Sequence, residues 1–151
     1  MALNYRLGES SIRAVRKLNI QDLKLPERPE NAMPSLPADI TAESGEELMV
    51  LFGEITCWLD YIETQLYAAQ IDEEFEKQQL EEMHALEQIQ NKGEDKVTTM
   101  KAMAFANDDF LEQREKAHQA YAYRKMTETI YNRMERARFI VSREITRRSD
   151  K

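Results

Sequence analysis

The clearest pattern in the chain is a row of apolar residues at helical spacing that begins at residue 48. Its members are Leu48, Leu51, Phe52, Ile55, Trp58, Leu59, Ile62, Leu66 and Ala69. Residues 48, 55, 62 and 69 are seven apart, which is the spacing of a seam between packed helices. No proline interrupts the segment before Asn91-Lys92-Gly93, a typical helix end. We therefore expect one long helix over about 45–91.

The start of this helix has its own signal in Ser44-Gly45-Glu46-Glu47. A serine followed three residues later by glutamate forms a capping box, in which each side chain binds the backbone N–H of the other residue. This motif predicts that Ser44 is the N-cap.

A second helical region is expected over about 98–148, with a break near 107–109. Asn107-Asp108-Asp109 favours a fresh helix start, because these side chains compete for backbone N–H groups. The pattern after the break predicts a packing face that consists of Phe110, Leu111, His118, Ala122, Met126, Thr129, Ile130, Arg133, Ala137, Ile140, Val141 and Ile145.

Residues 1–43 form a different region, an N-terminal arm. All four prolines lie between Pro26 and Pro37, so this stretch should be extended and close to polyproline II. We expect it to lie along a helical surface as a strap, with Leu25, Met33 and Leu36 available for docking. Residues 10–18 fit two turns of helix, and a strand fits almost as well.

The expected fold class is thus all-α, a long antiparallel helical hairpin (44–151) with an extended proline-rich arm. Four glycines and four prolines in 151 residues argue against folds that need many tight turns. Two helices alone bury little apolar surface, so we expect a homo-oligomer assembled as a helical bundle. No apolar run reaches membrane-spanning length, and the first residues lack a signal peptide, so a cytoplasmic location in the host cell is expected.

Signatures of catalysis or metal binding are weak in this chain. The sequence contains no phosphate-binding loop, C-x-x-C or H-E-x-x-H motif, and its one cysteine, Cys57, lies in an apolar stretch where we expect it to be buried. Glu81-x-x-His84 and Glu115-x-x-His118 have the spacing of di-iron ligands. Their surroundings are polar and acidic, so we expect solvated helix faces, no cofactor, and a protein that is not an enzyme.

Charge is distributed very unevenly under the net value of −7. Residues 29–110 carry −15, whereas residues 1–28 carry +3 and residues 111–151 carry +5. The basic C-terminal helix is the strongest binding feature, because arginine matches phosphate oxygens and aromatic rings stack on unpaired bases. The candidate nucleic-acid-binding residues are Arg133, Arg136, Arg138, Arg143, Arg147, Arg148, Tyr123 and Tyr131. The alternative is that basic residues of this helix pair with the acidic middle, at Glu73, Glu74, Glu76, Glu81 and Glu82.

Several stretches resemble a group of small helical proteins of tailed bacteriophages. They are L-P-A-D-I-T (36–41), E-E-L-M-V-L-F-G-E-I-T-C-W-L-D-Y (46–61), A-Y-A-Y-R-K-M-T-E-T-I-Y (120–131) and V-S-R-E-I-T-R-R (141–148). The size, helical layout and basic helix are also similar to the UvsY-type recombination mediators. That resemblance implies an oligomer that binds single-stranded DNA and works with a recombinase or single-strand-binding protein.

The sequence therefore favours a phage accessory protein of DNA recombination or replication, with single-stranded DNA bound by the C-terminal helix. A second hypothesis, from another class, is a structural or protein-interaction module: a virion component, an assembly factor or an acidic inhibitor of a host protein. In that case the acidic middle would be the working surface.

Overall fold

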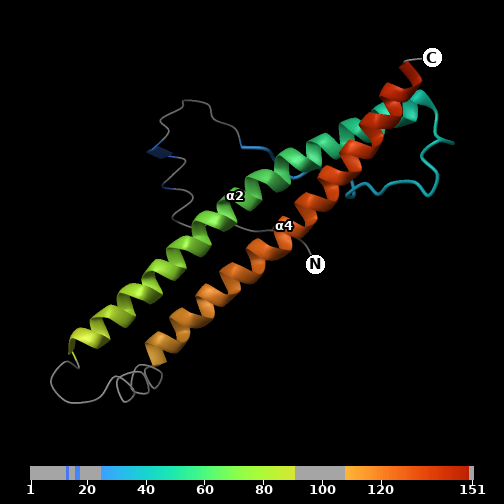
Figure 1. The fold of residues 1–151 in the computed structure, drawn as a ribbon. Helices are drawn as coiled ribbons and strands as arrows, with labels where there is room; N and C mark the ends of the chain where they lie inside the picture. Colours follow the sequence, from blue (N-terminus) through green and yellow to red (C-terminus); the bar gives the residue numbers. More distant parts are fainter. Residues whose placement is uncertain (1–12, 14–15, 18–24, 91–107, 150–151) are drawn as a thin grey trace. The chain divides into compact units, whose positions relative to one another are not determined.

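A computed structural model describes residues 13, 16, 17, 25–90 and 108–149. Two long helices, α2 (Gly45–Gln90) and α4 (Asp108–Ser149), pack against each other as an antiparallel hairpin (Figure 1). Within the described ranges there is no strand, so the all-α expectation is confirmed. The predicted helix end at Gly93, the helical start near residue 98 and the cap at Asn107 lie outside the described residues.

Contacts divide the hairpin into two units. Unit 2 contains the described residues 25–67 and 126–149, and unit 1 contains residues 68–90 and 108–125 together with Arg13, Arg16 and Lys17. These three basic residues are helical and exposed. Within the described part of the chain, neither long helix is apolar enough to cross a membrane.

The N-terminus of α2 is the capping box that the sequence predicts. The Glu47 N–H donates to Ser44 Oγ at 3.1 Å, and the Ser44 N–H donates to Glu47 Oε2 at 2.7 Å. The Leu48 N–H donates to the Ser44 carbonyl at 3.1 Å, which makes it the first backbone bond of the helix. Two N–H groups that the helix itself leaves without acceptors are thereby satisfied.

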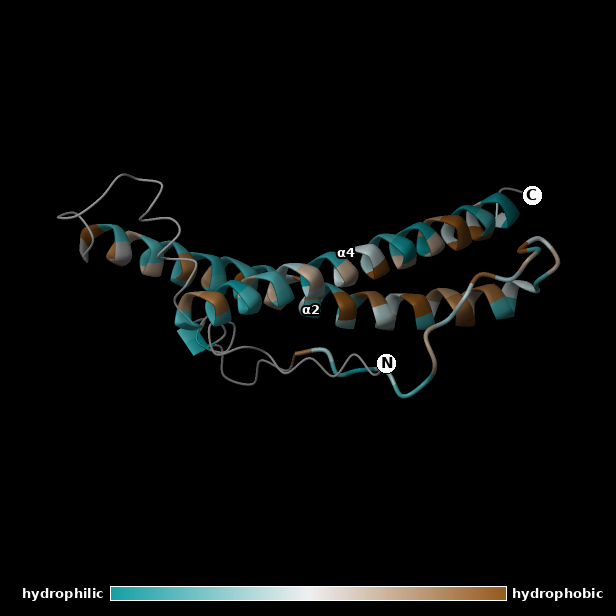
Figure 2. Ribbon diagram, turned by 90° about the horizontal axis from the view of Figure 1, so that it is seen from below, coloured by the Kyte–Doolittle hydropathy of each residue, from teal (hydrophilic) through white to brown (hydrophobic). Residues whose placement is uncertain are grey.

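The predicted seam on α2 is also confirmed. Leu48, Ile55, Ile62 and Ala69 are each at most 3% exposed. In unit 2 this seam and its neighbours form a hydrophobic core with residues of α4, whose buried members are Leu48, Ile55, Trp58, Leu59, Tyr61, Ile62, Met134, Ala137 and Val141. Figure 2 shows how frequent hydrophobic positions are on this part of α2.

The packing face predicted for α4 is partly wrong. Leu111, Met126 and Ile140 were expected to pack, but they are 36%, 62% and 43% exposed. The buried row is instead Thr127, Met134 and Val141, which are seven residues apart and at most 2% exposed. The buried positions of α4 include the polar side chains Thr127 and Glu144, so the spacing of apolar residues alone does not mark the buried face.

Residues 25–44 form the strap, which lies in unit 2 and has no regular secondary structure (Figure 1). Met33, Leu36 and Ile40 pack against the core, as expected for the first two. Near its end, Asp39 accepts hydrogen bonds from the N–H (2.9 Å) and hydroxyl (2.6 Å) of Thr41, which lower the pKa of its carboxyl. This turn leads the chain into the Ser44 cap.

Candidate nucleic-acid interface

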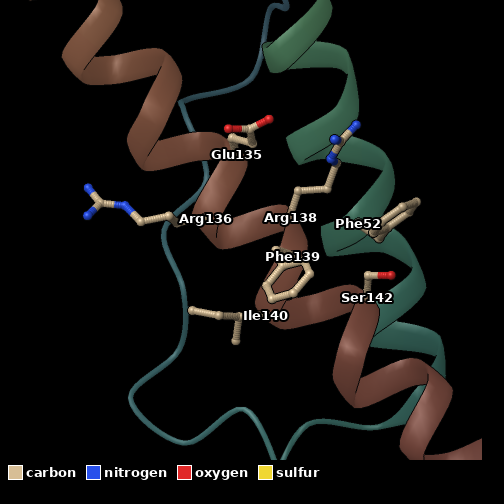
Figure 3. A pocket seen from close by; sticks show the side chains of 7 residues that line it. All are labelled: Phe52, Glu135, Arg136, Arg138, Phe139, Ile140 and Ser142. Carbon is tan, nitrogen blue, oxygen red and sulfur yellow. The ribbon is translucent and has the colours of Figure 1, made fainter.

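The C-terminal part of α4 presents three arginines on one side of the helix. Arg133, Arg136 and Arg143 are all exposed, and their spacing of three and seven residues places them along one stripe. We call these three residues the arginine face. A fourth exposed arginine, Arg138, points toward the side on which Phe52 of α2 lies, whereas Arg136 points away from it (Figure 3).

These guanidinium groups are not used for ion pairs with the described part of the chain. Among the residues that the structure describes, Arg133, Arg136, Arg138 and Arg143 form no salt bridge. Arg136 Nε donates to the Asn132 carbonyl of its own helix at 3.2 Å. Most donors of the four groups are therefore available to an anion from outside.

Two apolar side chains lie among these arginines. Phe139 is 55% exposed and Ile140 is 43% exposed. The Arg143 guanidinium lies 4.3 Å from the centre of the Phe139 ring, within the range of a cation–π contact. This contact orients a solvent-facing ring beside a cation, which is the combination that stacks on nucleic-acid bases.

A groove of about 560 Å³ runs beside Phe139 (Figure 3). Its lining comes from Phe52 on α2 and from Glu135, Arg136, Arg138, Phe139, Ile140 and Ser142 on α4. All of these residues belong to unit 2. Phe52 is half-buried and packs against the core, so one wall of the groove is held in place by the fold.

Arg147 and Arg148, which the sequence groups with the other arginines, bind the buried carboxylate of Glu144. Arg147 donates to both of its oxygens, at 2.8 and 2.6 Å, and Arg148 Nε donates to Oε1 at 2.8 Å. These bonds hold the pKa of Glu144 at about 2, below its ordinary 4.5. Both arginines therefore have an intramolecular partner.

Arg148 also holds the strap. Its Nη1 donates to the Glu43 carbonyl at 2.7 Å, and its Nη2 donates to the Thr41 carbonyl at 3.2 Å. The side chain is only 28% exposed. We therefore assign Arg148 to the fold of unit 2 and separate it from the candidate interface.

Neither candidate tyrosine lies on the arginine face. Tyr131 is half-buried against the core of unit 2, and burial raises the pKa of its hydroxyl, with Glu135 and Glu63 adding to the effect. Tyr123 is half-buried in unit 1. The ring that accompanies the arginines is Phe139, and its position three residues after Arg136 and four before Arg143 was the available sequence signal.

Pairing between basic and acidic residues, the alternative from the sequence, does occur in unit 1. Arg124 Nε donates to Glu73 Oε2, and its Nη2 donates to Oε1 at 3.3 Å. The two side chains are 16% and 21% exposed. The basic residues of α4 thus divide into those that pair within the protein and those that face solvent.

The histidines and the cysteine that the sequence offers as metal ligands or reactive groups do not form a site with other described residues. Across the described residues, no three His, Cys, Asp or Glu side chains are grouped so that they could hold a metal ion. His84 contacts Gln88 Nε2 through Nδ1 at 3.0 Å and lies beside the Phe110 ring. Cys57, expected to be buried, is exposed, because it lies on the side of α2 opposite the core.

Comparisons with known protein families, curated proteins and solved structures find no match to this chain.

Proposed function

We propose that the protein is a non-enzymatic accessory factor of phage DNA recombination or replication that binds single-stranded DNA. Binding is through the arginine face and Arg138, and Phe139 provides the stacking surface. The resemblance to mediator proteins supplies the biological setting, with a recombinase or a single-strand-binding protein as partner. On this proposal several copies of the chain act together as a homo-oligomer.

The observation that carries the proposal is a set of exposed arginines that form no salt bridge with any described residue, with an exposed phenylalanine in their midst. Elsewhere on α4, Arg124, Arg147 and Arg148 have carboxylate partners. Guanidinium groups bind phosphate oxygens through paired hydrogen bonds, and this contact releases counterions from the nucleic acid.

The aromatic ring favours single strands over duplex. A base in a duplex is stacked on its neighbours and exposes only its edges, whereas an unpaired base can place its face on Phe139. The carboxylates of the protein lie mainly in residues 29–110, so DNA contact is confined to one side of one helix.

Fluorescence anisotropy of labelled oligonucleotides at increasing salt tests the proposal. Single-stranded DNA should bind more tightly than duplex, with a log–log salt slope of about −2 to −3 if four phosphates are contacted. The variant Arg133→Glu/Arg136→Glu/Arg143→Glu should lose binding and flatten the slope. A matched control, Lys77→Glu/Lys116→Glu/Lys125→Glu, changes the net charge equally at three exposed lysines of unit 1 and should retain most binding.

Equal loss in the two triple variants would mean that only overall charge matters, and it would contradict the assignment of the interface to this face of α4. Absence of binding by the parent protein at low salt would refute DNA binding itself. Circular dichroism should show unchanged helix content in both variants, because all six substituted residues are exposed.

A second candidate function, a protein-interaction module, is favoured by a second groove of unit 2. Met49 and Val50 of α2 are 57% and 59% exposed, and they line a groove of about 430 Å³ whose other wall is Pro29–Asn31 of the strap. This function would be supported by a protein that is captured from infected cells in the presence of nuclease, that is no longer captured by Met49→Glu/Val50→Glu, and that is still captured when the charges of the arginine face are reversed.

A further inference from the structure

We propose that the groove between Phe52 and Phe139 receives an unstacked base of the bound DNA strand. This inference rests on the proposed function and deepens it. The arginine face accounts for attraction to any polyanion. Occupation of the groove would make the affinity for a strand depend on whether that strand carries bases.

The groove has an aromatic ring on each of two helices. Figure 3 shows the two rings, Phe52 on α2 and Phe139 on α4. Phe52 is anchored by its contacts with the core, and Phe139 stands in solvent with the Arg143 guanidinium 4.3 Å from its centre. A flat nucleobase gains most from such a site, because it buries apolar area on a fixed wall and stacks on an accessible ring. The volume of about 560 Å³ lies within the range of pockets that hold small molecules.

The charges around the groove fit a nucleotide better than an apolar ligand. Arg138 lies toward one side of Phe139, and Arg136 lies toward the other (Figure 3). A strand that crosses α4 here can place phosphates on both guanidinium groups while the base between them enters the groove. An apolar peptide would leave these charges without a partner.

Polar groups inside the lining suit the edge of a base. Glu135 offers carboxylate acceptors, and Ser142 offers a hydroxyl that can donate or accept. Exocyclic amino groups and ring N–H groups of bases are donors that match the carboxylate. The same carboxylate repels a phosphate, so the strand should enter base first, with its phosphates toward the arginines.

The test compares two labelled oligonucleotides of equal length and charge, a thymidine oligomer and its abasic analogue made of sugar and phosphate only. The parent protein should bind the thymidine strand at least about fivefold more tightly, the lower end of the effect of one stacked base. Phe139→Ala should lose about fivefold or more on the thymidine strand and little on the abasic strand, with an unchanged salt slope.

Two further variants separate stacking from general disruption. Phe139→Trp should keep the preference for bases, whereas Phe139→Leu, which is apolar but has no ring face, should lose it. The matched control is Tyr121→Ala, which removes a ring that is also about half exposed on α4 and lies near a guanidinium, that of Arg124 at 5.3 Å. That change lies in unit 1 and should leave both affinities unaltered.

Equal affinity for the two strands would overturn the inference, and so would equal effects of Phe139→Ala and Tyr121→Ala. The proposed function would survive either result, provided that reversal of the arginine face still abolished binding. Failure of the parent protein to bind either strand would overturn both proposals. Displacement of the thymidine strand by an acidic aromatic peptide, with no preference for bases, would assign the groove to a protein ligand.

Discussion

The two units of the hairpin are built from the same two helices but are stabilised differently. Unit 2 has a core of large aliphatic and aromatic side chains from α2 and α4, covered by Met33, Leu36 and Ile40 of the strap. Among the described residues of unit 1, the buried side chains are Ala68, Ala69, Asp72 and Phe110. Contacts between the helices of unit 1 include polar ones, from Arg124 to Glu73 and from Gln113 to Glu76.

This difference shows how a helical hairpin can divide its tasks. Burial of apolar area is the main favourable term in folding, and among the described residues most of the buried apolar side chains lie in unit 2. The proposed DNA-binding surface is also in unit 2, so its arginines stand on the helix segment that contributes Met134, Ala137 and Val141 to this core. The polar pairs of unit 1 specify which residues face each other and contribute less to stability.

The largest expected effect is a loss of folding stability, and it can be compared between the units by truncating one isoleucine of α2 in each. Ile55→Ala should destabilise the protein by about 2–5 kcal/mol, because Ile55 is 1% exposed in the core of unit 2 and its loss leaves a cavity. Ile71→Ala should cost less than about 1 kcal/mol, since Ile71 is 40% exposed in unit 1. Urea denaturation followed by circular dichroism measures both, and equal costs would contradict the contrast.

The next effect concerns the strap. Arg148→Ala removes the charge-assisted hydrogen bonds to the Glu43 and Thr41 carbonyls and one of the two partners of Glu144, so we expect a loss of about 1–3 kcal/mol. Amide hydrogen exchange should rise in residues 25–44. The control Arg143→Ala should leave exchange there unchanged, and a strap equally protected in both variants would show that Arg148 does not hold it.

A smaller effect is expected for the ion pair between the helices of unit 1. Arg124→Met should cost about 1–2 kcal/mol, between the values for exposed and fully buried pairs. The control Lys116→Met breaks a 2.7 Å pair with Glu112 whose side chains are 52% and 67% exposed, and it should cost clearly less than Arg124→Met because solvent screens the pair. Thermal unfolding distinguishes the two, and similar costs would mean that the Arg124 pair acts like a surface pair.

The last prediction concerns acid stability. The pKa of Glu144 is lowered to about 2 because Arg147 and Arg148 donate to the ionised carboxylate. Its stabilising effect is therefore complete above pH 4.5, the ordinary value, and is lost as the pH falls from 4.5 toward 2. Glu144→Gln should be less stable than the parent at neutral pH and should lose less stability over this acid range, as measured by urea denaturation at several pH values. Parallel curves would contradict this role.

Much of the helical architecture was predictable because its signals are local. The Ser44–Glu47 capping box and the heptad spacing of α2 depend on neighbours within a few turns, and both are confirmed. The face of α4 was partly mispredicted because Thr127 and Glu144 are buried, while Leu111, Met126 and Ile140 face solvent. The spacing of apolar residues cannot identify a packing face when some of the residues on that face are polar.

The candidate interface was predictable only as a collection of residue types. Sequence reasoning grouped six arginines and two tyrosines, but Arg148 binds the strap and Tyr131 packs on the core. These roles depend on contacts with residues about 70 to 105 positions away along the chain, for which the local sequence has no signal. The local sequence does not distinguish Phe139 from the tyrosines of α4, because its exposure depends on the register of the helix pair.

The sequence by itself determined that this protein forms long helices, where α2 begins, which side of α2 packs, and that its basic charge collects near the C-terminus. These properties follow from hydrogen bonding and periodicity within single helices. The tertiary structure alone decided which arginines are neutralised by carboxylates, which aromatic ring faces solvent, and how the strap is attached. Those outcomes depend on how one element packs on another, since burial and ion pairing are properties of the contact and not of either segment.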